Sequence, residues 1–120
     1  MCYSLSMTLR EILELTEATL VCGSHHADDT ITYGFASDLM SDVLTILKDD
    51  IIMITGLSNM QAVRTAEMSD IRNILLVRNK QPSQAMIEIA EELGISISYT
   101  PYSLFRVSGI LYGAGLKPVY

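Results

Sequence analysis

The sequence is poor in several residue types that mark common protein classes. Its 120 residues include no tryptophan, two cysteines and three prolines. Two cysteines are too few for a disulfide framework, so we expect Cys2 and Cys22 to be ordinary reduced thiols. The three prolines and seven glycines do not gather into a linker or a low-complexity tract. We therefore expect residues 1–120 to form a single domain.

Basic residues are also scarce. Eight Lys and Arg stand against fourteen Asp and Glu, which gives a formal net charge of −6. Binding to DNA or RNA depends on neutralising phosphates with basic side chains, so this balance argues against a nucleic-acid partner. The stretch 61–80 departs from the balance, because its four basic residues outnumber two acidic ones. A small anionic ligand is compatible with that stretch.

Long apolar runs are missing as well. No run approaches the roughly 18 residues needed to cross a bilayer, and the charged residues 48–50 precede the longest one, Ile51–Ile54. The first residues lack the basic start and apolar stretch of a signal peptide. We therefore expect a cytoplasmic protein with no membrane partner.

The sequence does have a repeated alternation of strand and helix patterns, and 49% of its residues are hydrophobic. Strands are predicted at 19–22, 31–36, 51–54, 74–77 and 95–99. Helices are predicted near 9–17, over Leu39, Met40, Val43, Leu44 and Leu47, over Met60, Ala62, Val63 and Ala66, from Pro82 to Gly94, and through Leu104, Phe105, Ser108 and Leu111. Strands that alternate with helices indicate βαβ crossovers. We therefore expect an α/β fold, with a mostly parallel sheet and helices on both faces.

Short polar residues indicate where the helices begin. The expected starts are a capping box of Thr8 and Glu11, then Ser37 or Asp38, then Ser58 or Asn59, then Pro82 in a first turn, and finally Thr100 with Pro101. The region 24–29 is polar and reads as a loop.

The ends of the buried strands are the candidate ligand site, because open α/β sheets hold ligands beyond the carboxyl ends of their strands. Free amides and the helix dipole at 55–59 favour an anion, and Arg64 and Arg78 could converge on the same phosphate or carboxylate. The candidate residues are Thr55, Gly56, Ser58, Asn59, Arg64 and Arg78. Plain helix capping is the alternative interpretation. The loop has neither a Walker pattern nor G-x-G-x-x-G.

Other chemistry is weakly supported. His25 and His26, with Asp28 and Asp29, offer metal-ligand atoms in one loop, but no second cluster completes the set. We therefore expect a solvated loop, no metal and no cofactor. No Ser or Cys follows a nucleophile-elbow pattern, and the paired carboxylates are neighbours at turns or on one helix. An enzyme is not indicated, and we assign no catalytic residue.

The last segment, 99–120, is rich in aromatic residues. It holds Tyr99, Tyr102, Phe105, Tyr112 and Tyr120. Tyrosine is favoured at contact surfaces because it combines apolar area with a polar tip. Self-association and completion of the domain's own core both remain open for these side chains.

Several segments in order resemble a DRTGG domain: 36–43 (ASDLMSDV), 54–56 (ITG), 63–68 (VRTAEM), 82–94 with IAEELG at its end, and 100–105 (TPYSLF). The chain is most similar to the small stand-alone type. That type is related to the module between CBS domains of some inorganic pyrophosphatases and to the N-terminal domain of HPr kinase/phosphorylase. The sequence departs from the name-giving residues, with TGLS at 55–58 where the family has Thr-Gly-Asp-Arg and VRN at 77–79 where it has Thr-Gly-Gly.

The resemblance implies an α/β domain without catalysis of its own, commonly a regulatory or dimerisation module. An HPr kinase label is not supported, since that active site belongs to a separate kinase domain that we do not find in this sequence. We expect a non-enzymatic regulatory or interaction module that forms a homodimer or binds a protein partner, and that responds to a small anionic metabolite. The alternative is a sensor that binds a nucleotide or phosphorylated metabolite at the strand-end loops.

Overall fold

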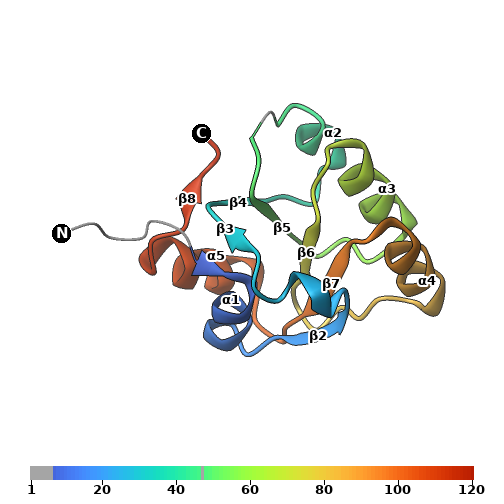
Figure 1. Ribbon diagram of the computed structural model, residues 1–120. Helices are drawn as coiled ribbons and strands as arrows, with labels where there is room; N and C mark the ends of the chain where they lie inside the picture. The colour runs from blue at the N-terminus through green and yellow to red at the C-terminus, as the bar shows by residue number, and fades with distance from the viewer. Residues whose placement is uncertain (1–6, 47) are drawn as a thin grey trace.

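A six-stranded sheet forms the centre of the molecule (Figure 1). The computed structural model describes residues 7–46 and 48–120. The strand order is β2 (Thr19–Cys22), β7 (Ser96–Tyr99), β6 (Asn73–Leu76), β5 (Ile51–Thr55), β4 (Tyr33–Ala36) and β8 (Lys117–Pro118). Strands β4 to β7 are mutually parallel, β8 is parallel to β4, and β2 is antiparallel to β7. The predicted mostly parallel α/β sheet is confirmed.

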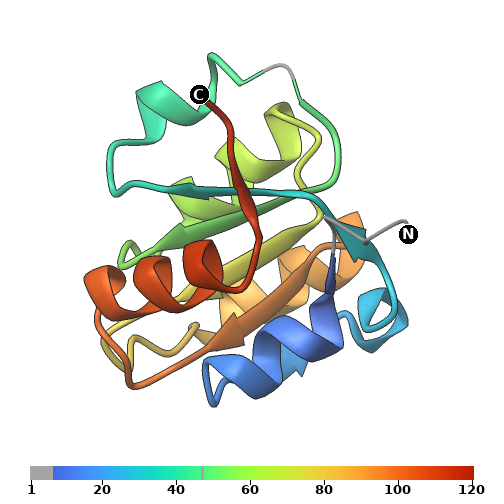
Figure 2. The ribbon, with the colours of Figure 1, turned by 90° about the vertical axis from the view of Figure 1, so that its left-hand side faces the viewer.

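Helices cover both faces of this sheet, as predicted. The helices are α1 (Leu9–Leu15), α2 (Met40–Val43), α3 (Met60–Met68), α4 (Gln84–Leu93) and α5 (Leu104–Gly113), with a 3-10 turn η1 (Ser24–His26). Helices α1 and α5 lie on one face, and α2, α3 and α4 lie on the other (Figures 1 and 2). Among the described residues, no helix has the length and apolar character needed to cross a membrane.

The central strands are buried on both sides because their side chains alternate between two cores. In β5, Ile51 and Met53 pack with α2, α3 and α4, whereas Ile52 and Ile54 pack with α1 and α5. Every residue of β5 and β6 is buried. Full burial of one such side chain contributes about 1.5–3 kcal/mol, so these continuous apolar runs provide much of the driving force for folding.

Two of the predicted helix starts are confirmed. Thr8 and Glu11 form a reciprocal capping box at α1. At α3 the structure selects Asn59 over Ser58, because the Asn59 side chain accepts the Ala62 N–H at 3.2 Å.

The predicted start of the second helix is wrong. Helix α2 has four residues, and its N-cap Leu39 makes no side-chain cap hydrogen bond. The Ser37 hydroxyl accepts the Leu39 N–H, while the Asp38 carboxylate binds the next strand end. Leu39 and Leu44 are exposed rather than part of an apolar face, and Leu47 lies outside the described residues.

The last two helices begin later than predicted. Ser83 caps α4 and Ser103 caps α5, so Pro82 precedes its helix and Thr100 does not cap one. Thr100 is instead fully buried, and its hydroxyl donates to the Thr16 carbonyl at 2.6 Å. A buried hydroxyl needs a hydrogen-bond partner, so the Thr100 side chain bonds to Thr16 instead of capping a helix.

The predicted strand 31–36 is interrupted. Thr30–Ile31 forms β3, which pairs antiparallel with β1 (Met7–Thr8) in a small second sheet, and β4 begins at Tyr33. The N–H groups of Thr32 and Tyr33 both donate to the Asp50 carbonyl, so the chain changes sheet at this point.

Candidate functional site

The carboxyl ends of the parallel strands meet at one edge of the sheet, as the sequence predicts. Strand β4 leads into Asp38, β5 ends at Thr55 and Gly56, and β6 leads into Arg78. The register pairs Ala36 with Ile54. These neighbouring ends bring a carboxylate, a hydroxyl, a backbone amide and a guanidinium into one cluster, which we call the strand-end site.

Asp38 is the centre of this site. Its Oδ1 accepts the Gly56 N–H at 2.7 Å and the Thr55 hydroxyl at 2.9 Å. The hydrogen bond from the Gly56 amide lowers the pKa of the Asp38 carboxyl below its ordinary value, against the opposing effect of partial burial. The Thr55 hydroxyl and the nearby Arg78 charge act in the same direction as the amide. Asp38 is therefore a stable anion within the site.

Arg78 reaches the site because its backbone adopts an unusual conformation. Arg78 and Asn79 both have a φ of +57°, the left-handed region that costs free energy for residues other than glycine. Two hydrogen bonds hold this turn, from Arg78 N to the Tyr102 carbonyl and from Asn79 N to the Thr100 carbonyl, both at 2.8 Å. The loop after β6 is thus fixed to the loop after β7.

The Arg78 guanidinium lies directly against Gly56. A Cβ at position 56 would stand 2.5–2.7 Å from the guanidinium atoms, so only glycine leaves room for this arrangement. Arg78 Nη1 is 3.8 Å from Asp38 Oδ2, and both side chains are about half exposed, at 47% and 46%. That distance exceeds a hydrogen bond, so this contact leaves the guanidinium donors open to an oxyanion.

The remaining polar groups of the loop support its shape. The buried Thr55 hydroxyl donates to Asp38 and accepts the Leu57 N–H at 3.1 Å. The Ser58 hydroxyl donates to the Gln81 carbonyl at 2.7 Å and joins this loop to the loop after β6. Two of the amides that the sequence assigns to a ligand anion, those of Gly56 and Leu57, are therefore bonded to the protein itself.

The structure brings together some of the predicted site residues and not others. Thr55, Gly56 and Arg78 share the strand-end site. Asn59 serves as the helix cap, and Arg64 pairs with Glu67 within α3 at 3.4 Å. Sequence reasoning missed Asp38 as a site residue because it treated the side chain as a helix cap. An acidic residue directly after a strand, at the edge where other strand ends gather, was the available signal.

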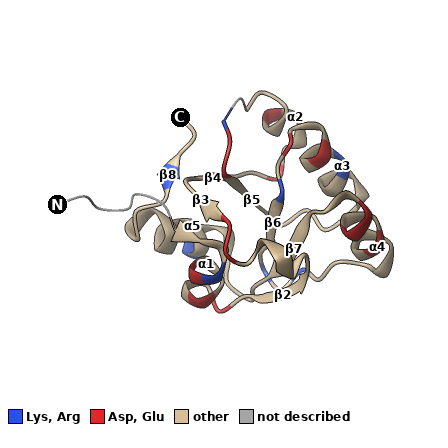
Figure 3. Cartoon of the chain, in the orientation of Figure 1, with Lys and Arg blue, Asp and Glu red and all other residues tan. Residues whose placement is uncertain are grey.

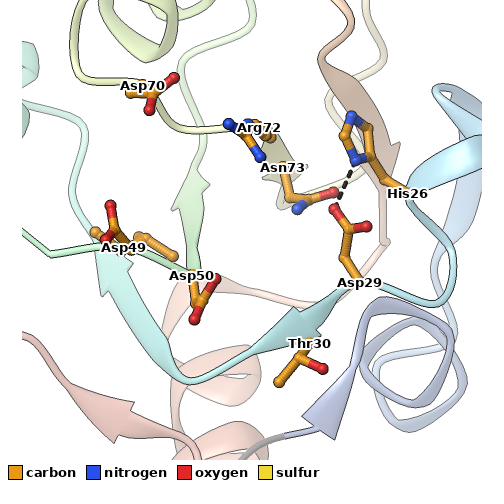
Figure 4. Close-up of a pocket in the computed structure, with 9 residues that line it drawn as sticks. His26, Asp29, Thr30, Asp49, Asp50, Asp70, Arg72 and Asn73 are labelled. Carbon is orange, nitrogen blue, oxygen red and sulfur yellow. Dashed lines mark hydrogen bonds and ion pairs between the residues drawn. The ribbon is translucent and has the colours of Figure 1, made fainter.

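A second hollow lies at the opposite edge, where the central strands begin (Figure 4). Its volume is about 500 Å³. Its lining residues are His26, Asp29, Thr30, Asp49, Asp50, Ile51, Asp70, Arg72 and Asn73. Figure 3 shows acidic segments before β3 and β5 at this edge. Four carboxylates and one guanidinium line this hollow, so its negative charge would repel a phosphate.

His26 is a structural residue in this region and departs from the predicted solvated loop, whereas Ser24, His25 and Asp28 of that loop are exposed as predicted. The imidazole is buried; Nδ1 contacts the Asp29 carboxylate and Nε2 contacts the Gly94 carbonyl, each at 2.5 Å. Through these two contacts the imidazole joins the loop before β3 to the end of α4. In the described residues, no three His, Cys, Asp or Glu side chains form a group that could hold a metal ion. Cys22 is buried and free, with a pKa raised by burial, whereas Cys2 lies outside the described residues.

The architecture is that of an open α/β domain, the class in which ligands sit at the carboxyl ends of strands. The DRTGG domain model matches residues 11–114, and the chain belongs to the DRTGG domain family. No curated protein matches the chain. These findings confirm the family resemblance seen in the sequence.

A solved structure shares the fold. The CBS and DRTGG domains of the regulatory region of Clostridium perfringens pyrophosphatase, complexed with the activator diadenosine tetraphosphate, align with a TM-score of 0.72. The identity is 16%, and the match covers 87% of this chain and 45% of that chain. The present chain therefore corresponds to under half of that region. In that protein the matched fold is part of a regulatory region.

Proposed function

We propose that this chain is a non-enzymatic cytoplasmic module that senses a small anionic metabolite at the strand-end site and acts as a homodimer or with a protein partner. The observation that carries the proposal is the Arg78 guanidinium. A strained turn and two inter-loop hydrogen bonds hold it over Gly56, and its contact with Asp38 is only a long one. Backbone strain tends to cluster at ligand sites, and at Arg78 it coincides with a guanidinium whose nearest carboxylate is 3.8 Å away.

The position of Asp38 suggests how binding would be detected. A phosphate has the charge and geometry to form a bidentate pair with a guanidinium, which a carboxylate 3.8 Å away does not achieve. A bound phosphate would therefore draw Arg78 away from Asp38. Asp38 would remain bonded to Gly56 and Thr55, so the response would be a movement of the loop after β6.

A nucleotide is the ligand class that we favour within this proposal. The structural neighbour is a regulatory region complexed with a dinucleotide activator, and the strand-end site offers the cation that a phosphate chain requires. Regulation fits the local chemistry better than catalysis. The Thr55 hydroxyl is buried, and its hydrogen bonds to Asp38 and Leu57 serve the loop.

Isothermal titration calorimetry on the whole chain tests this proposal. The titrants are AMP, ADP, ATP, diadenosine tetraphosphate and inorganic phosphate. We expect saturable binding of at least one compound, and Arg78→Gln should weaken it about 10- to 100-fold, the usual effect of losing a hydrogen bond to a charged group.

Arg10→Gln is the matched control, since Arg10 is also a half-exposed arginine in an ion pair, with Asp28 on the η1 side of the molecule. Its affinity should equal that of the unmodified chain. Absence of binding by every titrant, or equal affinity in the Arg78→Gln variant, would refute the proposed site.

A further inference from the structure

The hollow at the edge where the central strands begin is lined by charged side chains of both signs. They precede three strands: Asp29 before β3, Asp49 and Asp50 before β5, and Asp70 and Arg72 before β6. Because β5 and β6 are parallel neighbours, their starts lie at one edge, and the topology gathers these residues around one hollow of about 500 Å³. That volume is in the range of small-molecule sites, about 300–1,000 Å³.

The basic side chain of this hollow has no acidic partner. Arg72 is exposed, and within residues 7–46 and 48–120 its guanidinium forms no ion pair and no side-chain hydrogen bond. Four carboxylates nevertheless line the same hollow. Lys48, which precedes Asp49, lies over the Tyr33 ring at 5.2 Å from its centre and does not line the hollow. Opposite charges therefore face one space without contact.

A buried amide also opens into the hollow. Asn73, the first residue of β6, is 4% exposed, and its Oδ1 accepts the Ser96 hydroxyl at 2.6 Å. The amide nitrogen Nδ2 carries two N–H donors, which have no partner in the described part of the chain. Nδ2 is not sealed off from the surface, and Asn73 lines the hollow, so these donors are available to an acceptor from outside.

The donors and the carboxylates lie on different sides of the hollow. In Figure 4 the Arg72 and Asn73 side chains lie between Asp49 and Asp50 on one side and Asp29 on the other. A guanidinium with a neighbouring amide suits a carboxylate, because it offers several N–H groups in a fixed arrangement. The aspartates suit ammonium groups. Since acidic side chains outnumber the single arginine, a ligand with more positive than negative charge is favoured.

A bare metal ion does not meet these requirements. Over the residues that the structure describes, no three His, Cys, Asp or Glu side chains are close enough to hold one. Arg72 and the Asn73 amide are donors, and a metal ion needs acceptors. The hollow instead fits an organic molecule that carries its acidic and cationic groups at separate ends.

We propose that this hollow, which we call the strand-start site, binds a basic α-amino acid, a small molecule with one carboxylate and two cationic groups. The carboxylate pairs with Arg72 and with Asn73 Nδ2, and the cationic groups pair with Asp49 and Asp50. The strand-start site lies at the opposite edge of the sheet from Arg78. It is therefore a second ligand site, and it does not depend on the proposed function.

Calorimetric titration of the whole chain with four compounds tests the strand-start site. L-lysine and L-arginine have the proposed chemistry, cadaverine is lysine without its carboxylate, and norleucine has no cationic group on its side chain. We expect saturable binding of at least one basic amino acid. Cadaverine and norleucine should bind at least about tenfold more weakly, because each lacks one half of the recognition.

Arg72→Gln should act on the carboxylate half alone. We expect it to weaken the binding of the basic amino acid at least about tenfold, without weakening that of cadaverine, which has no carboxylate. A general disturbance of the fold would weaken both. Arg10→Gln again serves as the control, because Arg10 pairs with Asp28 and does not line the hollow.

Asp50→Asn should act on the cationic half. Asp50 has a φ of +58°, a conformation that asparagine tolerates, so the variant should fold. We expect the basic amino acid and cadaverine both to bind about three- to tenfold more weakly. Asp42→Asn, at an exposed aspartate of α2 that does not line the hollow, should change neither affinity.

Three results would overturn the inference. Equal affinities for lysine and cadaverine would assign the hollow to cations without a carboxylate. Unchanged binding of the basic amino acid in Arg72→Gln would place its site elsewhere. No binding of either basic amino acid up to about 10 mM would remove the site altogether. None of these results affects nucleotide binding at Arg78, which is titrated separately.

Discussion

The Arg78 guanidinium occupies the space that a side chain on Gly56 would need, with its atoms 2.5–2.7 Å from the position of a Cβ. Gly56 is thus required by a neighbour and not by its own backbone angles, since its φ is not in the positive range. The pair links the end of β5 to the loop after β6, and it holds the cation of the strand-end site in place.

Gly56→Ala should separate ligand binding from stability. The methyl group displaces the guanidinium, which is the far end of a flexible side chain, so the free energy of unfolding should fall by less than about 1 kcal/mol. The affinity for the titrant that binds the unmodified chain should fall about tenfold. Urea unfolding and calorimetry measure the two quantities. Gly113→Ala, at a helical glycine in open space, should leave the affinity unchanged and should not lower the free energy of unfolding. Unchanged affinity in Gly56→Ala would mean that the guanidinium position is unimportant.

Asp38→Ala should have a pH-dependent effect on stability. The folded-state pKa of Asp38 lies below its ordinary value, so its contribution is present above the unfolded-state pKa and is lost as the pH falls through the folded-state pKa. Near neutral pH we expect a loss of about 1 kcal/mol, because the carboxylate is half exposed. The difference from the unmodified chain should shrink towards about pH 3.

Thermal unfolding at both pH values measures the Asp38 effect. Asp49→Ala removes another exposed carboxylate and serves as the control. A difference between Asp38→Ala and the unmodified chain that stays constant from neutral to acid pH would show that the charge of Asp38 does not stabilise the fold.

The adjacent histidines should respond unequally to substitution. His26→Ala removes contacts to Asp29 and to the partly buried Gly94 carbonyl and leaves a cavity where the imidazole is buried, at a cost of about 2 kcal/mol. His25 is exposed, and His25→Ala should cost below about 0.5 kcal/mol. Denaturant unfolding of the two variants checks this. Equal losses would contradict the structural role of His26.

The two-sided core should be sensitive to truncation. Leu75 in the centre of β6 is fully buried, and Leu75→Ala should lower the free energy of unfolding by about 3 kcal/mol. Leu39→Ala, at an exposed leucine beside α2, should change it by less than about 0.5 kcal/mol. Chemical denaturation followed by circular dichroism measures both. A small effect at Leu75 would mean that the sheet is covered on one face only.

The strands were the most predictable part of the fold. The apolar runs at 51–54 and 74–77 have one physical explanation, a strand covered on both faces, and β5 and β6 lie there within a residue or two. The parallel topology predicted that Thr55, Gly56 and Arg78 lie at one edge, whereas the left-handed turn that brings the Arg78 guanidinium against Gly56 was not visible in the sequence.

The errors occurred where a polar side chain had a distant partner. The Thr100 hydroxyl donates to the carbonyl of Thr16, 84 residues away, and no local sequence pattern predicts this hydrogen bond. Asp38 likewise bonds to the end of the next strand instead of its own helix. Arg64 is a separate case, because its partner Glu67 is only three residues away on the same helix. The guanidinium pairs with Glu67, and that choice depends on rotamers that a sequence does not specify.

The hydrogen bond from Arg78 N to the Tyr102 carbonyl joins the strand-end site to the start of α5, three residues before Phe105. If a ligand at Arg78 alters the binding of a second copy or of a protein partner, the coupling free energy is reciprocal, and that binding must alter ligand affinity by the same factor. The effect of nucleotide on assembly and the effect of assembly on nucleotide affinity would then report the same coupling free energy, so either experiment would measure it.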